Sequence, residues 1–232
     1  MFFNAYRNYV VSHLYNTVFS EGNDIDSDDF TIQLLDKVDH NIKNRETKNA
    51  LLRQIAIGHF YRKSSCNVNE NAFNSFFKMS TSEDDKKLVN KLLDDIKNLH
   101  KGNKVSPFEI IDYNKVTHNI STVIRGKKSV VYFWNPVYMS KDYVASKVNY
   151  FRKKYPELNF VGVKINNGKV DRIKGLDIKS QFYLTDTSEA NKFLTSHMPR
   201  TILVDKNGIV INGYASLSSQ NIYQQIGELA KY

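Results

Sequence analysis

The side chains that could do covalent chemistry are few and widely spaced in this sequence. Cys66 is the single cysteine among 232 residues, so one chain can hold neither an internal disulfide nor a two-cysteine redox centre. A zinc site built from cysteines alone is excluded for the same reason. A lone thiol can still form a mixed disulfide or a disulfide between two chains. Cys66 lies in a polar Ser-Ser-Cys-Asn segment, where we expect it to be exposed and chemically inert.

Other reactive groups lack the neighbours that catalysis or metal binding needs. The six histidines are at positions 13, 40, 59, 100, 118 and 197, with no spacing typical of metal ligands. Ser140 could act as a nucleophile, but no histidine lies near it in the sequence, and a helix N-cap role explains it sufficiently. The stretch 125–128, Arg-Gly-Lys-Lys, lacks the spaced glycines of a phosphate-binding loop. We therefore predict no catalytic residue, no metal and no cofactor.

Charge is distributed unevenly along the chain. The formal net charge is +9, and residues 101–232 carry 20 Lys and Arg against 10 Asp and Glu. A basic half would suit nucleic acid, a lipid surface or an acidic protein, whereas scattered lysines also serve solubility alone. No nucleic-acid motif focuses the charge. No apolar run approaches the roughly 20 residues that span a bilayer, so we expect no transmembrane segment.

Residues 1–100 have the apolar spacing of amphipathic helices, three and four residues apart. Four helices are expected over about 3–18, 30–42, 51–63 and 69–79. Residues 80–84 supply capping and acidic first-turn side chains for a fifth, which ends before Gly102. The sequence therefore predicts an all-α helical domain over residues 1–100.

The periodicity changes in the second half. Residues 129–134 and 159–164 read as buried strands, and Ser140 caps a helix between them that ends before Pro156. Strand, helix and strand with short joints form a right-handed βαβ unit with parallel pairing. Residues 165–180 read as irregular, before a short extended piece at 181–184. The remaining expectations are a helix over 186–197, a hairpin of strands 201–205 and 209–214, and a last helix from Ser218 or Ser219.

Four stretches of the second half occur in the order found in one protein family. They are residues 101–110 (KGNKVSPFEI), 125–134 (RGKKSVVYFW), 153–163 (KKYPELNFVGV) and 198–210 (MPRTILVDKNGIV). Together they resemble the TlpA/ResA-type thiol–disulfide oxidoreductases of the bacterial envelope. The resemblance implies an α/β, thioredoxin-like domain over residues 101–232, with a central mixed sheet flanked by helices. It also implies that Pro199 is the cis-proline beside the active-site loop.

The sequence departs from this family at the reactive centre. The family pattern is F-W-x-x-x-C-x-x-C, and here Tyr138 and Lys141 replace the two cysteines. Dithiol chemistry needs a low-pKa thiolate at the helix N-terminus and a second thiol to resolve the mixed disulfide. Tyrosine and lysine can do neither. We therefore predict a degenerate active-site loop, which consists of Trp134, Asn135, Pro136, Val137, Tyr138, Met139, Ser140 and Lys141.

Three functions remain open from the sequence. The first is a redox-inactive thioredoxin-like protein that binds or scaffolds an unknown protein or peptide partner, for which the loop and Pro199 could form a groove. The second is an enzyme of the same family that uses an unrecognised residue or Cys66. The third is a binder of an anionic partner through the basic half.

Location also has two readings. Residues 1–10 lack the basic start and apolar run of a signal peptide. The family resemblance implies the periplasm or cell envelope after removal of a leader, and the alternative is the cytoplasm.

Overall fold

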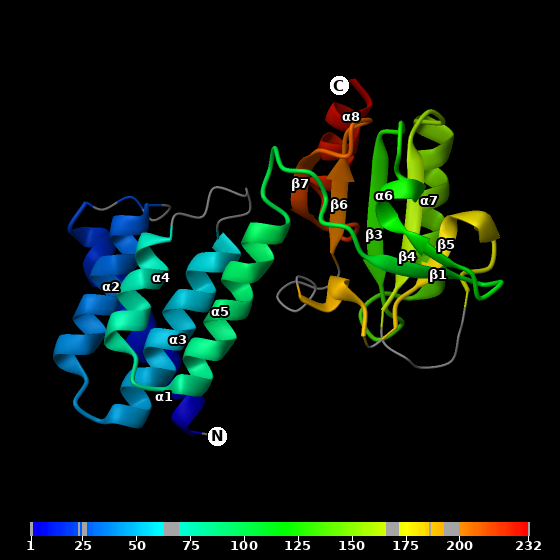
Figure 1. The fold of residues 1–232 in the computed structure, drawn as a ribbon. Coiled ribbons are helices and arrows are strands. Elements are labelled where there is room, and N and C mark those ends of the chain that lie inside the picture. The colour runs from blue at the N-terminus through cyan, green and yellow to red at the C-terminus, as the bar shows by residue number, and fades with distance from the viewer. Residues whose placement is uncertain are drawn as a thin grey trace. The chain divides into compact units, whose positions relative to one another are not determined.

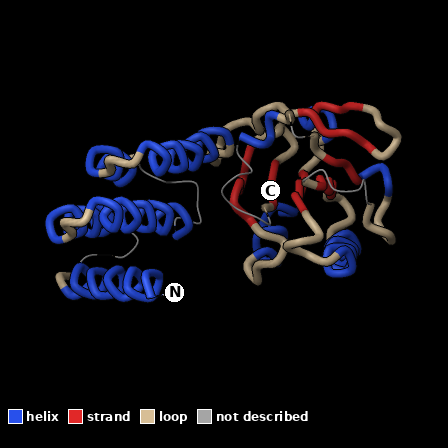
Figure 2. Tube along the Cα trace, turned by 90° about the horizontal axis from the view of Figure 1, so that it is seen from below, coloured by secondary structure: helices blue, strands red, loops and turns tan. Residues whose placement is uncertain are grey.

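The computed structural model describes residues 2–22, 24, 27–62, 70–165, 172–185, 187–192 and 200–231. The chain forms two compact units, Met1–Leu93 and Asp94–Tyr232, and every described strand belongs to the second (Figures 1 and 2). Cys66 and Pro199, the expected cis-proline, lie outside the described residues. Within the described part, no helix combines the length and apolar character needed to cross a membrane.

The first unit is helical, as the sequence predicts. Its helices are α1 (Phe2–Ser20), α2 (Asp28–Asn41), α3 (Arg45–Arg62), α4 (Asn71–Met79) and most of α5 (Glu83–Asn98). Helix α2 packs against α1, α3 and α4. Its start is fixed locally, because the Ser27 hydroxyl accepts a hydrogen bond from the Phe30 amide at 3.0 Å and Asp28 and Asp29 favour the positive end of the helix dipole.

A buried polar contact joins two of these helices. His59 of α3 places Nδ1 2.8 Å from Thr31 Oγ1 and Nε2 3.2 Å from Asp28 Oδ1, both on α2. The order Asp, His and hydroxyl resembles a catalytic triad, but the Thr31 and His59 side chains are fully buried. No substrate could reach the hydroxyl, so this contact ties α2 to α3.

The second unit is built on one seven-stranded mixed sheet. Its strands are β1 (Glu109–Asp112), β2 (Thr117–Asn119), β3 (Ser129–Trp134), β4 (Asn159–Lys164), β5 (Gln181–Tyr183), β6 (Thr201–Val204) and β7 (Val210–Ala215). Their order is β2-β1-β5-β4-β3-β6-β7. Strands β3, β4 and β5 are parallel, whereas β1 pairs antiparallel with β5 and β6 antiparallel with β3. The predicted βαβ unit and C-terminal hairpin are both present.

Alternate residues of β3 enter two separate cores. Val130, Tyr132 and Trp134 face helices α7 (Lys141–Lys154) and α8 (Ile222–Lys231). Val131 and Phe133 face the opposite side, which the chain around residues 99–108 and helix α6 (Ile120–Val123) cover. A strand buried on both faces explains the continuous apolar sequence 129–134. The sheet therefore carries helices on both sides.

Two parts of the second unit differ from the sequence prediction. The helix expected over 186–197 is wrong for its described part, which holds only the 3-10 turn Glu189–Lys192. Ser188 Oγ donates to the Glu109 carbonyl and accepts from the Ala190 amide, while Asn191 Nδ2 donates to the Thr185 carbonyl. These side chains bond backbone groups in place of a regular helix.

The hairpin β1–β2 is absent from the sequence prediction. Its strands have four and three residues, too few for a recognisable alternation. The turn between them is held by Asp112, whose Oδ1 accepts from the amides of Asn114 and Val116 at 2.8 and 2.9 Å. Lys115 takes a positive φ of 67° in this turn. In the sequence, Asp112 followed by Asn114 is the signal that could have indicated a turn here, because such side chains often accept hydrogen bonds from the backbone two residues later.

The start of the second unit can be tested by truncation. Leu99 is fully buried in its core, and a Cβ added to Gly213 of β7 would lie 2.7 Å from the Leu99 carbonyl oxygen. We expect a chain of Asp94–Tyr232 to be more stable than one of residues 101–232 by at least about 2–5 kcal/mol, the cost of emptying one large core position. The shorter chain also lacks Asp95, which forms a buried ion pair with Arg200, so the measured difference includes both losses. Urea unfolding followed by the fluorescence of Trp134, the single tryptophan, measures the difference. Equal stability of the two fragments would contradict this packing.

Candidate functional site

The degenerate loop lies at one end of the sheet, directly after β3. The register places Trp134, the last residue of β3, opposite Lys164, the last residue of β4. The antiparallel strand β6 begins at this same end, and the Phe133 amide donates to the Arg200 carbonyl at 2.8 Å. The backbones of β3, β4 and the start of β6 therefore lie together where β3 passes into α7.

Asn135 fixes the first half of the loop. Its buried side chain accepts a hydrogen bond from the Val137 amide through Oδ1 at 2.8 Å, and its carbonyl accepts from the amides of Tyr138 and Met139, each at 3.0 Å. On the strand side, the Ile165 amide donates to the Trp134 carbonyl at 3.0 Å. The loop is thus a turn with its own hydrogen bonds, held to β4.

Ser140 fixes the second half as the N-cap of α7. Its Oγ accepts from the Tyr143 amide at 3.2 Å and its carbonyl accepts from the Val144 amide at 3.1 Å. Within the described residues, no histidine hydrogen-bonds Ser140, so the capping role suffices to explain it. Lys141 begins the helix, where the dipole disfavours a cation, and Asp142 in the same turn offsets it.

The side chains of the loop divide into a buried and an exposed set. Trp134, Asn135 and Met139 are buried. Val137 is 82 % exposed and Tyr138 is 57 % exposed. Tyr138, the residue that the sequence analysis expects at the first cysteine position, is therefore presented to solvent on a hydrogen-bonded turn. This surface can contact another molecule, and it offers no thiol.

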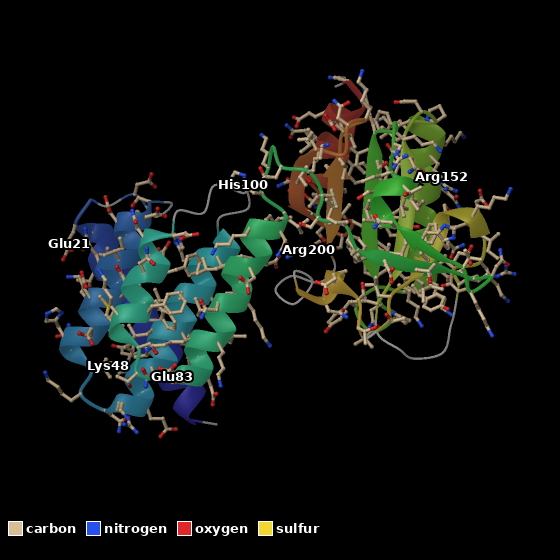
Figure 3. The ribbon with its side chains drawn as sticks, in the orientation of Figure 1. Glu21, Lys48, Glu83, His100, Arg152 and Arg200 are labelled. Carbon is tan, nitrogen blue, oxygen red and sulfur yellow. The ribbon has the colours of Figure 1, made fainter. Side chains whose placement is uncertain are left out.

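Three charged side chains at this end of the sheet were missed by the sequence analysis. Lys164 is 5 % exposed, and Arg200 and Asp95 are both fully buried. Arg200, which Figure 3 labels, forms a two-pronged ion pair with Asp95 from the last turn of α5, with Nη2 2.7 Å from Oδ2. Tyr214 of β7 lies under the guanidinium, whose carbon is 4.7 Å from the ring centroid.

The ion pair has an unusual titration because it is buried. Burial raises the pKa of Asp95 to about 6, although the hydrogen bond and the charge of Arg200 and a hydrogen bond from Tyr214 act in the opposite direction. A sequence feature does indicate Asp95: it lies three residues after Leu92 and four before Leu99, on the apolar face of its helix. An acid on such a face requires a buried partner.

Among the described residues, no group of three His, Cys, Asp or Glu side chains is placed to hold a metal ion. Cys66, the candidate thiol, lies outside the described part of the chain. What the described geometry provides is a rigid exposed turn over buried charges.

Comparison with known proteins gives the fold. No family model matches the chain, and no curated protein matches it. A solved thioredoxin-like protein from Bacteroides caccae is 13 % identical, covers 87 % of this chain and 78 % of its own, and superposes with a TM-score of 0.56. The thioredoxin domain of a thiol-disulfide oxidoreductase from Bacteroides vulgatus is 21 % identical over 57 % of this chain and 99 % of its own, with a TM-score of 0.43. A thiol:disulfide interchange protein from a Bacteroides species is 19 % identical over 58 % of this chain and 93 % of its own, also with a TM-score of 0.43.

The fold assignment rests on the Bacteroides caccae structure. Its match covers more of the chain than the second unit alone contains. The chain is therefore a thioredoxin-like protein in its fold.

Proposed function

We propose that this chain is a thioredoxin-like protein without dithiol redox activity, and that it uses the degenerate loop to bind a protein or peptide segment. The observation that carries the proposal is the pair Tyr138 and Lys141 at the start of α7, the two positions where dithiol exchange needs thiols. A fold alone does not define an activity, and the residues at the site decide it.

The exposed loop supports binding. Val137 and Tyr138 present apolar and aromatic surface on a turn whose backbone is fixed by Asn135 and Ser140. A tyrosine on a rigid turn gives contact area at little entropic cost, which is why this residue is common in binding surfaces. Lys141 beside it would add a charge preference for an acidic segment.

Photocrosslinking tests this proposal. We expect a photoreactive phenylalanine analogue at position 138 to give a discrete protein adduct in the cells that make the protein. The same analogue at Tyr9, which is 70 % exposed in the first unit, is the matched control and should not give that adduct. Identical adducts from both positions, or none from position 138, would contradict a specific role for the loop.

We also propose a location in the cell envelope. The support is the resemblance of the stretches 101–110, 125–134 and 198–210 to envelope oxidoreductases. Cell fractionation of the native protein tests this location, and we expect the protein in the envelope fraction. In the photocrosslinking experiment, an adduct with cytosolic proteins alone would favour the alternative location, the cytoplasm.

A further inference from the structure

A second candidate site lies at the opposite end of the sheet from the degenerate loop. It is an open cavity of about 480 Å³, lined by three segments, 104–105, 121–126 and 206–208. These segments precede β1, form α6 and the turn after it, and connect β6 to β7. Because β3 starts and the antiparallel β6 ends here, the sheet separates this cavity from the loop.

The rim of the cavity carries three cations and no carboxylate. Lys104, Arg125 and Lys206 are exposed, one from each segment, and no described residue forms a hydrogen bond or an ion pair with their side chains. The nearby acid Asp205 turns inward, where its Oδ1 accepts from the amides of Asn207 and Ile209 at 2.8 Å each. Asp205 therefore serves the turn, and the residues that line the cavity include three cations and no carboxylate.

The floor adds apolar contact and a hydroxyl. Val105 and Ile124 are buried beneath the rim, and Ser121 lines the wall. A hydroxyl can donate to an anionic oxygen, while the apolar floor can hold a small organic group. A volume of about 480 Å³ exceeds what an inorganic anion fills, so the cavity has room for such a group.

The walls are held in place before any ligand arrives. The segment with Lys104 runs alongside the β6–β7 turn: the Val105 amide donates to the Gly208 carbonyl at 3.0 Å, and the Val210 amide donates to the Asn103 carbonyl at 2.8 Å. The turn after α6 is closed by a hydrogen bond that the Lys127 amide donates to the Ile124 carbonyl at 3.1 Å. Three cations on a fixed frame favour an anion more than three independent lysines would.

We infer that this cavity binds the phosphate group of a small organic phosphate, with Arg125, Lys104 and Lys206 around the oxygens and the Val105–Ile124 floor under the organic part. A phosphate dianion matches several converging cations, and an arginine can bind two of its oxygens at once. The site shares no residue with the degenerate loop. A failure of this inference would therefore leave the proposed function unchanged, and the reverse also holds.

Titration of the full-length protein tests the inference. The probes are phenyl phosphate, inorganic phosphate and sodium chloride at matched ionic strength. Binding of each probe is measured by the change in the amide chemical shifts of the protein. We expect saturable shifts around residues 104–105, 121–126 and 206–208 with phenyl phosphate and none with chloride. Equal affinity for inorganic phosphate would support the site and identify the free ion as its ligand, whereas tighter binding of phenyl phosphate would support the organic ligand.

Charge-matched variants distinguish binding in the cavity from non-specific attraction of anions to the positively charged second unit. Arg125→Gln with Lys206→Gln removes two rim cations, and Lys153→Gln with Lys179→Gln removes two exposed cations elsewhere in the same unit. The loss of one charged hydrogen bond corresponds to a change of about tenfold in affinity. Because the first pair removes two cations, we expect it to weaken phenyl phosphate binding by at least about tenfold, and we expect the second pair to leave it unchanged. Equal weakening by both pairs, or no saturable binding by the wild type, would overturn the inference. Duplex DNA binding that both pairs weaken equally would also overturn it in favour of a diffuse basic surface.

Discussion

Replacing Asp95 with alanine is expected to lower the free energy of unfolding by about 3–5 kcal/mol, the usual cost of removing one partner of a buried ion pair. Arg200 is fully buried and its two terminal nitrogens contact the two Asp95 oxygens. Without this carboxylate, the charge of Arg200 stays in the protein interior and loses the two-pronged contact with Asp95. Urea unfolding of the full-length protein measures the effect through Trp134.

Two variants control this experiment. Asp94→Ala removes an exposed neighbour on the same helix and should change stability by less than about 0.5 kcal/mol. Asp95→Leu combined with Arg200→Met replaces the pair with apolar side chains and should recover most of the loss, because desolvation of both charges is avoided. A double variant as unstable as Asp95→Ala would contradict the explanation by an unbalanced charge.

The pH dependence of this pair has a definite sign. Because burial raises the pKa of Asp95 from 3.8 to about 6, the folded state holds the proton more tightly than the unfolded state between these values. The proton-linked part of the stability that Asp95 contributes is therefore fully present below about pH 4 and is lost as the pH rises through 6. The cost of deleting the side chain, which includes its ion pair with Arg200, is a separate quantity and is compared at one fixed pH. The stability of the wild type relative to Asp95→Asn should fall from pH 4 to pH 7. A rise instead would show that attraction to Arg200 outweighs burial.

Restoring two cysteines is expected to create a reductase activity. Tyr138→Cys with Lys141→Cys places two thiols three residues apart at the start of α7 and removes the cation from its first turn. The first thiolate attacks a substrate disulfide and forms a mixed disulfide. The second thiol then releases the reduced substrate and leaves an internal disulfide, which dithiothreitol reduces again. We expect this variant to accelerate insulin reduction.

The single changes are the controls for this gain. Neither Tyr138→Cys nor Lys141→Cys alone supplies a resolving thiol, so both should match the wild type. All variants are compared in a Cys66→Ser background, which removes the one native thiol. A single variant as active as the double would contradict the requirement for a pair.

Local sequence patterns predicted much of this fold because apolar stretches and helix-capping residues act on the element in which they lie. The apolar stretch 129–134 and the capping residue Ser140 each indicate one element, and both elements are where the sequence places them. In the described part of the predicted helix over 186–197, side-chain hydrogen bonds of Ser188 and Asn191 accompany a 3-10 turn in place of the regular helix. The four-residue strand β1 is too short to show any period.

The candidate sites differ in the same way, by whether their residues are contiguous in the sequence. The degenerate loop could be found in the sequence because its eight residues are contiguous. The pair Asp95–Arg200 spans 105 positions, and the cations of the second cavity come from three separate segments. No spacing rule connects such residues, since only the folded sheet brings them together. The place of Asp95 on the apolar face of α5 could have indicated that a buried partner exists, but not which residue it is.

The most direct test of the central claim is insulin reduction by the wild type and by Cys66→Ser in the presence of dithiothreitol. A chain with one thiol cannot alternate between a dithiol and an internal disulfide, whatever the pKa of that thiol. We predict that both proteins leave the rate at the level of dithiothreitol alone. Turnover by the wild type that persists in Cys66→Ser would contradict the assignment of a redox-inactive thioredoxin-like protein.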